Sequence, residues 1–187
     1  DSGLLARAHM MQGEVLYDLG EFVQAREHFE QGIAFYDPQQ HRSDAFLYGN
    51  DTGLACLALV APALSSLGYW DQALKRSQEA LTRAQELSHP FSLAIALSNA
   101  AHVHYSRREG QAAQKRAEAL IALSTEQGFA FFLARGIFWQ GAALAGQSQG
   151  EEGIEQIRRG LVACQAIGTE LYRPGSLALL AEAYGKV

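Results

Sequence analysis

One serine in the chain could act as a nucleophile. Residues Gly146 to Gly150 contain the pattern Gly-x-Ser-x-Gly around Ser148, which in hydrolases places a serine on a strained turn between a strand and a helix. The preceding residues, 142–145, have a helical rather than a strand composition, and glycines with small polar residues are common in turns between helices. No matching base and oxyanion donors accompany the serine. We therefore expect no catalytic residue, and an enzyme is the least supported of the functions considered.

Histidines and cysteines are the candidate metal ligands. His102 and His104 lie two positions apart, which on a helix means about 200° around the axis, so they cannot bind one ion from one helix. Cys56 and Cys164 are far apart in sequence and flanked by apolar residues, which suits buried reduced thiols. The sequence predicts no metal site, no cofactor and a reducing, cytoplasmic location.

Composition and charge argue against a disordered chain, a nucleic-acid partner and a membrane span. The chain has 187 residues, 48% of them hydrophobic and 19% charged, which argues against disorder. Its formal net charge is -5, and residues 1–50 hold three basic against eight acidic residues. Basic pairs such as Arg107-Arg108 are scattered over different helices, so a nucleic-acid-binding surface is not expected. The sequence contains no apolar run long enough for a membrane span and no signal-peptide pattern at its start.

Four segments of the chain share one layout. Each combines an alanine-rich helix, a short turn, and a second helix with a small residue near its start and a small-plus-aliphatic pair seven positions later. Taking Ala25, Ala73, Ala112 and Gly153 as equivalent gives spacings of 48, 39 and 41 residues, inside the range of helical repeats. Small residues at these places suit helices that cross closely, with Gly13 and Ala25 at the first crossing and the later small residue meeting the next repeat.

The periodicity predicts an all-α protein. Apolar residues recur at helical spacing, and Pro38, Pro90 and Pro174 mark the borders between repeats. Pro62 falls inside an expected helix and predicts a kink there. We expect helices near residues 3–19, 21–36, 52–67, 70–87, 91–107, 110–127, 130–147, 150–167 and 175–187.

The connection Asp37–Thr52 is longer than an ordinary link between repeats. We expect a short helical turn through Ser43–Tyr48. Long connections often carry function, so this one is a candidate for ligand contact, and a packed structural loop is the alternative.

The order Gly13, Gly20, Ala25, Phe29 and Pro38 resembles the tetratricopeptide repeat family. The resemblance implies a right-handed α-solenoid of antiparallel helix pairs, a single domain over 1–187. Its repeats would lie near 3–38, 52–89, 91–128 and 130–170, followed by a terminal helix. Segments 41–49, 87–94 and 179–186 look like the C-terminal repeat region of bacterial multidomain regulators, in which a cyclase or other output domain precedes a signal-transduction ATPase. This likeness implies a regulatory arm of a larger protein, and no catalysis here, since the sequence contains no phosphate-binding loop. We expect the chain to be a fragment, because it opens on Asp1 without a start methionine and stops at Val187 within a helical pattern.

The usual handedness of such repeats places the first helix of each repeat on the concave surface. The predicted groove residues are Arg7, Met10, Glu14, Tyr17, Asp18, Ser65, Ser66, His104, Tyr105, Arg135 and Phe138. Such a mixture of rings and charges suits an extended peptide or a helix laid along the groove. Ordinary solvated positions are the alternative for each residue. The aromatic-rich segment 129–139 is expected to be mostly core, with one or two rings facing the groove.

Three functions remain open. The leading one is a scaffold or regulatory arm that binds a protein or peptide partner, or another domain of the parent chain. The second is a sensor that binds a small effector between repeats near the connection and Pro62. The third is the enzyme considered above. A homodimer through the terminal helix is also predicted, because Leu177, Leu180 and Ala181 would form an uncovered apolar face there.

Overall fold

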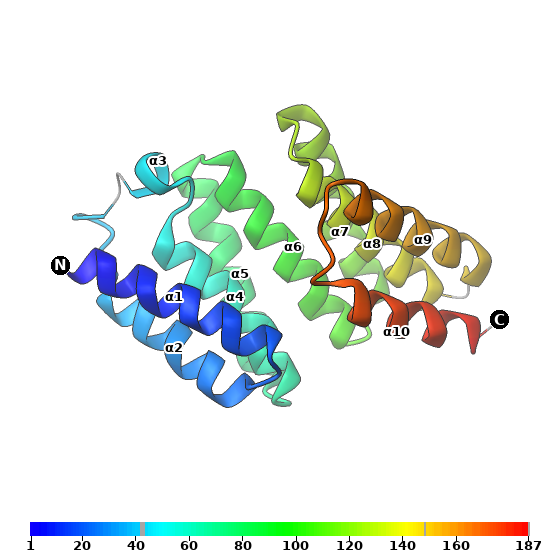
Figure 1. Ribbon diagram of the computed structural model, residues 1–187, viewed down its shortest axis with the longest axis horizontal. Coiled ribbons are helices and arrows are strands. Elements are labelled where there is room, and N and C mark those ends of the chain that lie inside the picture. The colour runs from blue at the N-terminus through cyan, green and yellow to red at the C-terminus, as the bar shows by residue number, and fades with distance from the viewer. Residues whose placement is uncertain (42–43, 148, 187) are drawn as a thin grey trace. The chain divides into compact units, whose positions relative to one another are not determined.

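A computed structural model describes residues 1–41, 44–147 and 149–186 (Figure 1). These residues contain ten helices and no strand, which confirms the all-α class. The helices are α1 (Ser2–Asp18), α2 (Phe22–Phe35), α3 (Asp44–Tyr48), α4 (Thr52–Ser66), α5 (Trp70–Leu87), α6 (Pro90–Ser106), α7 (Gly110–Gln127), α8 (Ala130–Ala145), α9 (Gly150–Ala166) and α10 (Arg173–Tyr184).

Proline positions agree with the predicted borders. Pro90 is the first residue of α6 and Pro174 the second of α10, where a missing N–H costs no helical hydrogen bond. Pro62 lies inside α4, and the helix continues across it. The predicted turn through Ser43–Tyr48 is α3, although Ser43 itself lies outside the described residues, as do Arg42, Ser148 and Val187.

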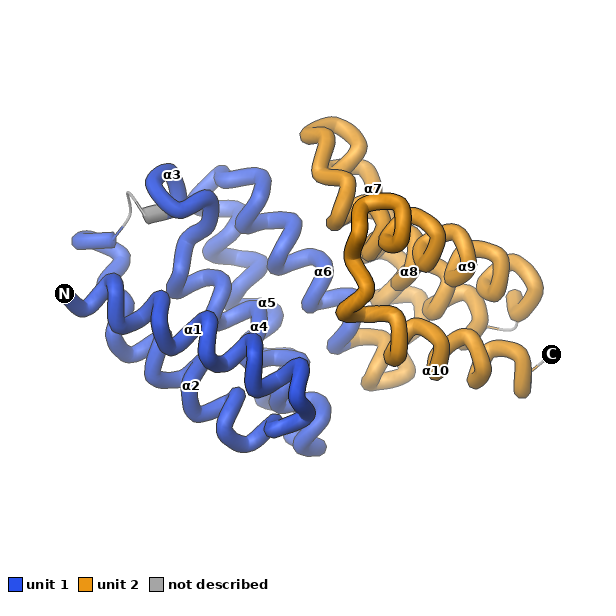
Figure 2. The backbone as a smooth tube through the Cα atoms, viewed as in Figure 1, with its two compact units in different colours: residues 1–103 blue, residues 104–187 orange. Residues whose placement is uncertain are grey.

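The described chain divides into two compact units, residues 1–103 and 104–187 (Figure 2). In the first unit α1 packs on α2 and α4, α2 on α4, and α4 on α5. Its core includes Phe29, Val60, Leu64 and Val103, all nearly inaccessible to solvent. In the second unit α7 packs on α8, α8 on α9, and α10 on both α9 and α8.

A tight turn joins the two helices within each of the four repeats. In each of these turns an amide N–H bonds to a carbonyl five residues earlier: Glu21 to Leu16, Tyr69 to Leu64 and Glu109 to His104, each at 2.9 Å, and Gln149 to Leu144 at 3.3 Å. The same bond also follows α7, from Phe129 to Ser124, and α9, from Thr169 to Cys164. The residue before the donor has a positive φ at Gly20, Gly68 and Arg108. This is the Schellman ending of a helix, in which a left-handed residue closes the last turn. The next helix therefore starts immediately after the previous one ends.

The recurring turn aligns the repeats and corrects one position. The N–H of the fourth residue after each turn donor bonds back to that donor's carbonyl, at Ala25, Ala73, Ala113 and Gly153. In the third repeat Ala113 is fully buried, whereas Ala112 is half-buried. The equivalent residue is therefore Ala113 rather than Ala112, and the spacings are 48, 40 and 40 residues.

Glycines lie where helices come closest. A Cβ on Gly13 would lie 2.6 Å from the Phe29 ring, so Phe29 rather than Ala25 occupies the space that Gly13 leaves. A Cβ on Gly32 would lie 2.5 Å from Cys56 Sγ of α4, which agrees with the expectation that the later small residue meets the next repeat. Gly160 differs, because its neighbour is Phe138 of α8, the preceding helix.

In the third repeat, the glycine that allows close helix packing lies on the facing helix α8 instead of on α7. The position equivalent to Gly32 and Gly160 is Leu120 in α7, which is large and fully buried. On the facing helix α8, Gly136 lies against Ile121 and the Ala117 carbonyl, and a Cβ there would lie 2.7 Å from the Ile121 side chain. A glycine on one helix thus offsets a bulky residue on the other.

We predict opposite effects for two Gly→Ala substitutions. A Cβ on Gly153 would lie 2.5 Å from the Ala145 backbone nitrogen, so Gly153→Ala forces α8 and α9 apart and should lower the free energy of unfolding by about 1–3 kcal/mol. A Cβ added to Gly175 of α10 would have no atom within 4 Å, so Gly175→Ala should be neutral or raise stability by up to about 1 kcal/mol. Urea unfolding of both variants measures the difference, and equal effects would contradict the close packing.

Candidate binding surfaces

In the first unit, α1 carries a charged side built from Arg7, Glu14 and Asp18. The Arg7 guanidinium lies over the ring of Tyr48 in α3, 4.5 Å from its centroid. Much of Glu14 is exposed, yet partial burial of its carboxyl raises its pKa, the charge of Asp18 raises it further, and Arg7 opposes the rise. These three residues form a mixed-charge surface next to an exposed aromatic residue.

Other predicted groove residues of this unit serve packing. Met10 is buried against Ala55 and Cys56, and Ser65 is buried as well. Tyr17 packs against the unit's core, with its ring 5.4 Å from that of Phe22. Ser66 is exposed at the end of α4. Met10 and Ser65 therefore offer no solvent-exposed contact.

The long connection is anchored at both ends. Asp51 is buried, caps α4 by accepting a 2.7 Å bond from the Leu54 N–H, and accepts a short hydrogen bond from the Tyr36 hydroxyl. Its own N–H donates to Ser92 Oγ of α6 at 3.3 Å. His41 is buried, and its Nδ1 accepts from the Asp37 N–H at 3.0 Å. These contacts hold the connection at His41 and Asp51, whereas the ring of Phe46 and the side chain of Leu47 in α3 are exposed.

In the second unit, one side of α8 forms a cluster of rings around a guanidinium. Phe131, Arg135 and Trp139 follow one another at spacings of four and so share a face of the helix. The Arg135 guanidinium carbon lies 4.4 Å from the ring centroid of Tyr172, 5.8 Å from that of Phe131 and 5.9 Å from that of Trp139. Each contact is within cation–π range. Phe131, Arg135 and Tyr172 are half-buried, whereas Trp139 is buried. We call these four residues the α8 aromatic cluster.

Tyr105, at the end of α6, extends this cluster. Its ring centroid lies 5.9 Å from that of Trp139, and its hydroxyl donates to Glu182 of α10 at 3.4 Å. Burial raises the pKa of Tyr105 to about 12, and the Glu182 charge adds to the rise. The pKa of Glu182 is lowered, chiefly by its hydrogen bond from Lys186.

His104 supports the turn after α6. Its Nδ1 lies 2.7 Å from Glu109 Oε2, and the Arg107 Nε donates to the other Glu109 oxygen at 2.8 Å. These two hydrogen bonds lower the pKa of Glu109, with that from His104 the larger cause. The structure therefore places the predicted groove residue His104 in a network that closes a turn.

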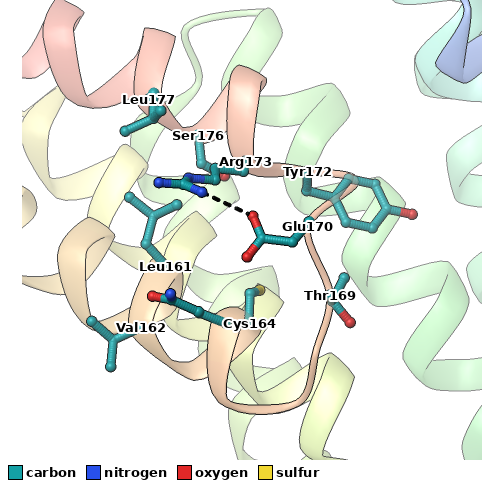
Figure 3. A pocket seen from close by; sticks show the side chains of 10 residues that line it. Leu161, Val162, Cys164, Thr169, Glu170, Tyr172, Arg173, Ser176 and Leu177 are labelled. Carbon is teal, nitrogen blue, oxygen red and sulfur yellow. Dashed lines mark hydrogen bonds and ion pairs between the residues drawn. The ribbon is translucent and has the colours of Figure 1, made fainter.

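A small pocket is lined by residues of α9, of α10 and of the segment between them, among them Tyr172 of the α8 aromatic cluster (Figure 3). Its volume is about 160 Å³. Leu161 and Cys164 come from α9, Tyr172 from the segment between the helices, and Leu177 from α10. Glu170 and Arg173 form an ion pair at 3.2 Å beside it. Because Tyr172 lines the pocket and also contacts Arg135, cluster and pocket make one continuous surface.

Sequence reasoning located part of this surface. Arg135 and Tyr105 were predicted and belong to it, whereas Phe138 is buried with its backbone against Gly160. Phe131, Trp139 and Tyr172 were not among the predicted groove residues. Phe131 and Trp139 could have been found from their spacing of four residues on either side of Arg135. Tyr172 lies outside the regular helix and gave no such signal.

Metal ligands, thiols and apolar helices are the remaining features with functional potential. The described residues contain no group of three or more His, Cys, Asp or Glu side chains arranged to hold a metal ion. Both cysteines are free thiols; Cys56 is buried, which raises its pKa to about 12, and Cys164 is half-buried. Among the described helices, none combines the length and hydropathy needed to cross a membrane. Ser148 of the Gly-x-Ser-x-Gly pattern lies outside the described residues.

Comparison with known proteins does not assign the chain to a family. No protein-family model matches the chain, and no curated protein matches it significantly. The resemblance to tetratricopeptide repeats therefore stays a prediction.

The ionisation of Tyr105 tests how this surface is packed. We expect Tyr105 to stay neutral at about pH 11, where tyrosines with an ordinary pKa are ionised, so the parent and Tyr105→Phe should show the same phenolate absorbance. A raised pKa means that stability linked to this proton is present below about pH 10 and is lost as the pH rises through 12. In Glu182→Gln the pKa should fall yet stay above its ordinary value, because burial is the larger cause. If folded Tyr105→Phe, verified by circular dichroism, showed one phenolate fewer than the parent at pH 11, Tyr105 would be ionised in the parent and the burial would be contradicted.

Proposed function

We propose that the chain is a helical-repeat binding module of the tetratricopeptide type, built from antiparallel helix pairs that stack with a right-handed twist. Four equivalent turns and the small residues that follow them support the pairing. A chain that reverses over two or three residues places consecutive helices side by side in opposite directions. The likeness of three segments to bacterial regulators supports a role as the regulatory arm of a larger signalling protein.

The partner that we propose is a segment of protein chain. The observation that carries this is the Arg135 guanidinium among three aromatic rings, next to the small pocket. Sites for small molecules usually have about 300–1,000 Å³, so a pocket of about 160 Å³ suits a single side chain better than a whole effector. Arginine and aromatic residues are also the side chains most often found at the centres of protein interfaces.

The lining of this surface indicates the chemistry of the segment. Leu161, Val162 and Leu177 offer an apolar pocket, while Arg135 offers a positive charge. A carboxylate bound to a guanidinium forms charge-assisted hydrogen bonds, which are stronger than neutral ones. We therefore expect the bound segment to combine an aliphatic side chain with a nearby Asp, Glu or C-terminal carboxylate.

Selection from a displayed peptide library tests this proposal. The parent chain should enrich peptides that pair an aliphatic residue with an acidic one, and Arg135→Gln should weaken their binding roughly 10- to 100-fold, the loss of a charged hydrogen bond. Lys115→Gln, which removes an exposed charge from α7, is the matched control and should bind like the parent. Fluorescence anisotropy with a selected peptide gives the affinities.

Two outcomes would overturn this function. Enriched peptides that bind equally well to Arg135→Gln would show that the α8 aromatic cluster is not the binding surface. A failure to enrich any peptide would favour the second candidate, a small-effector sensor in the first unit. There, Arg7 Nη1, Asn50 Oδ1 and Thr52 Oγ1 are buried and have no hydrogen-bond partner among the described residues, as expected where a polar ligand could bind.

A further inference from the structure

Two histidines from neighbouring helices of the first unit approach each other closely. His9 of α1 and His28 of α2 have their Nδ1 atoms 3.0 Å apart and their ring centroids 5.0 Å apart. Both side chains are half-buried, so solvent reaches them. A neutral imidazole has one N–H and one acceptor nitrogen, so one ring donates and the other accepts.

The two rings are held by rigid elements. α1 and α2 are locked at the contact of Gly13 with the Phe29 ring. The Phe35 ring stacks on His9 with the centroids 5.5 Å apart and the planes inclined by 22°. Neither histidine lies in a loop, so neither nitrogen has to be ordered when a ligand binds. Side chains that are preorganised in this way lose less entropy on binding.

We propose that His9 and His28 chelate a divalent transition metal of the Ni²⁺ or Cu²⁺ type. Metal–imidazole bonds are about 2.0–2.1 Å long, so nitrogens 3.0 Å apart would subtend about 90–97° at a shared ion. That is the angle between neighbouring ligands in square-planar or octahedral coordination, the geometry of Cu²⁺ and Ni²⁺. A tetrahedral Zn²⁺ ion would require the nitrogens about 3.3 Å apart.

Binding requires a change of tautomer and a rotation of the two rings. The ring that donates from Nδ1 transfers that proton to its Nε2 through solvent, and both rings then turn so that their Nδ1 lone pairs point at the ion instead of along the line between the nitrogens. Water occupies the remaining coordination positions, because the site is open to solvent and no third protein ligand of the described chain is grouped with the pair. Two ligands on rigid helices indicate micromolar rather than nanomolar affinity.

Calorimetric titration of the untagged chain with NiCl₂ tests the proposal. We expect one equivalent to bind, and His9→Phe and His28→Gln each to weaken binding at least tenfold, because either change removes the chelate. His9→Phe retains a ring to stack on Phe35, which protects the fold. Cys164→Ser removes the half-buried thiol of the second unit and should bind Ni²⁺ like the parent. Nickel serves as the probe because Cu²⁺ oxidises free thiols.

Thermal unfolding separates loss of the site from loss of the fold. The parent should melt at a higher temperature with excess Ni²⁺, and neither histidine variant should show this shift, since a ligand stabilises only a state that binds it. Binding of Ni²⁺ that is equal in the parent and in folded His28→Gln would show that the pair is a hydrogen bond alone. The result is independent of the peptide experiment, because no residue of the α8 aromatic cluster is changed.

Discussion

Close approach of helices at small residues is the constraint on which the rest of the structure depends. At Gly153 the α9 backbone lies so near Ala145 and Gly141 of α8 that no side chain fits between them. Such contact requires a short connection, and the repeated Schellman turn supplies it. Where α7 carries the bulky Ile121, the facing helix α8 carries Gly136. The packing therefore depends on complementary sizes across each crossing more than on a small residue at one fixed position.

This packing determines which side of α8 is left for binding. Phe138, Gly141 and Ala145 face α9, and Gly136 faces α7. At about 100° per residue, Phe131, Arg135 and Trp139 lie on a side between these two. Their neighbours are the ring of Tyr172 and, beyond Trp139, that of Tyr105. Phe131 and Arg135 are half-buried on this side, whereas Trp139 is buried, so the accessible part of the surface that we propose lies around Phe131 and Arg135.

Most of the fold could be predicted from the sequence, because helical periodicity, glycines and prolines are local signals. The helix limits agree within the expected few residues, and even the short helix α3 was anticipated. The register of the third repeat could not be predicted, because Ala112 and Ala113 are chemically identical. Only the position of the turn decides which of them is buried. The division into two compact units also has no counterpart in the sequence pattern.

The candidate surfaces were less predictable, because they depend on contacts between distant residues. Phe138 and Trp139 are both buried, but adjacent residues on a helix point about 100° apart, so Trp139 contacts Arg135 whereas Phe138 lies against Gly160. The pairing of His9 with His28 spans nineteen residues and two helices, and it depends on how Gly13 sets the crossing. Tyr172 reaches Arg135 only through the path of the segment before α10.

Nuclear Overhauser effects between the helices test the central structural claim most directly. We expect strong effects from the Gly13 α-protons to the Phe29 ring and from the Gly153 α-protons to the Ala145 amide, because nothing separates these groups. Their presence would establish the small-residue crossings in solution. Their absence, in a chain whose amide shifts remain helical, would show that the helices form without the close packing from which the surfaces are derived.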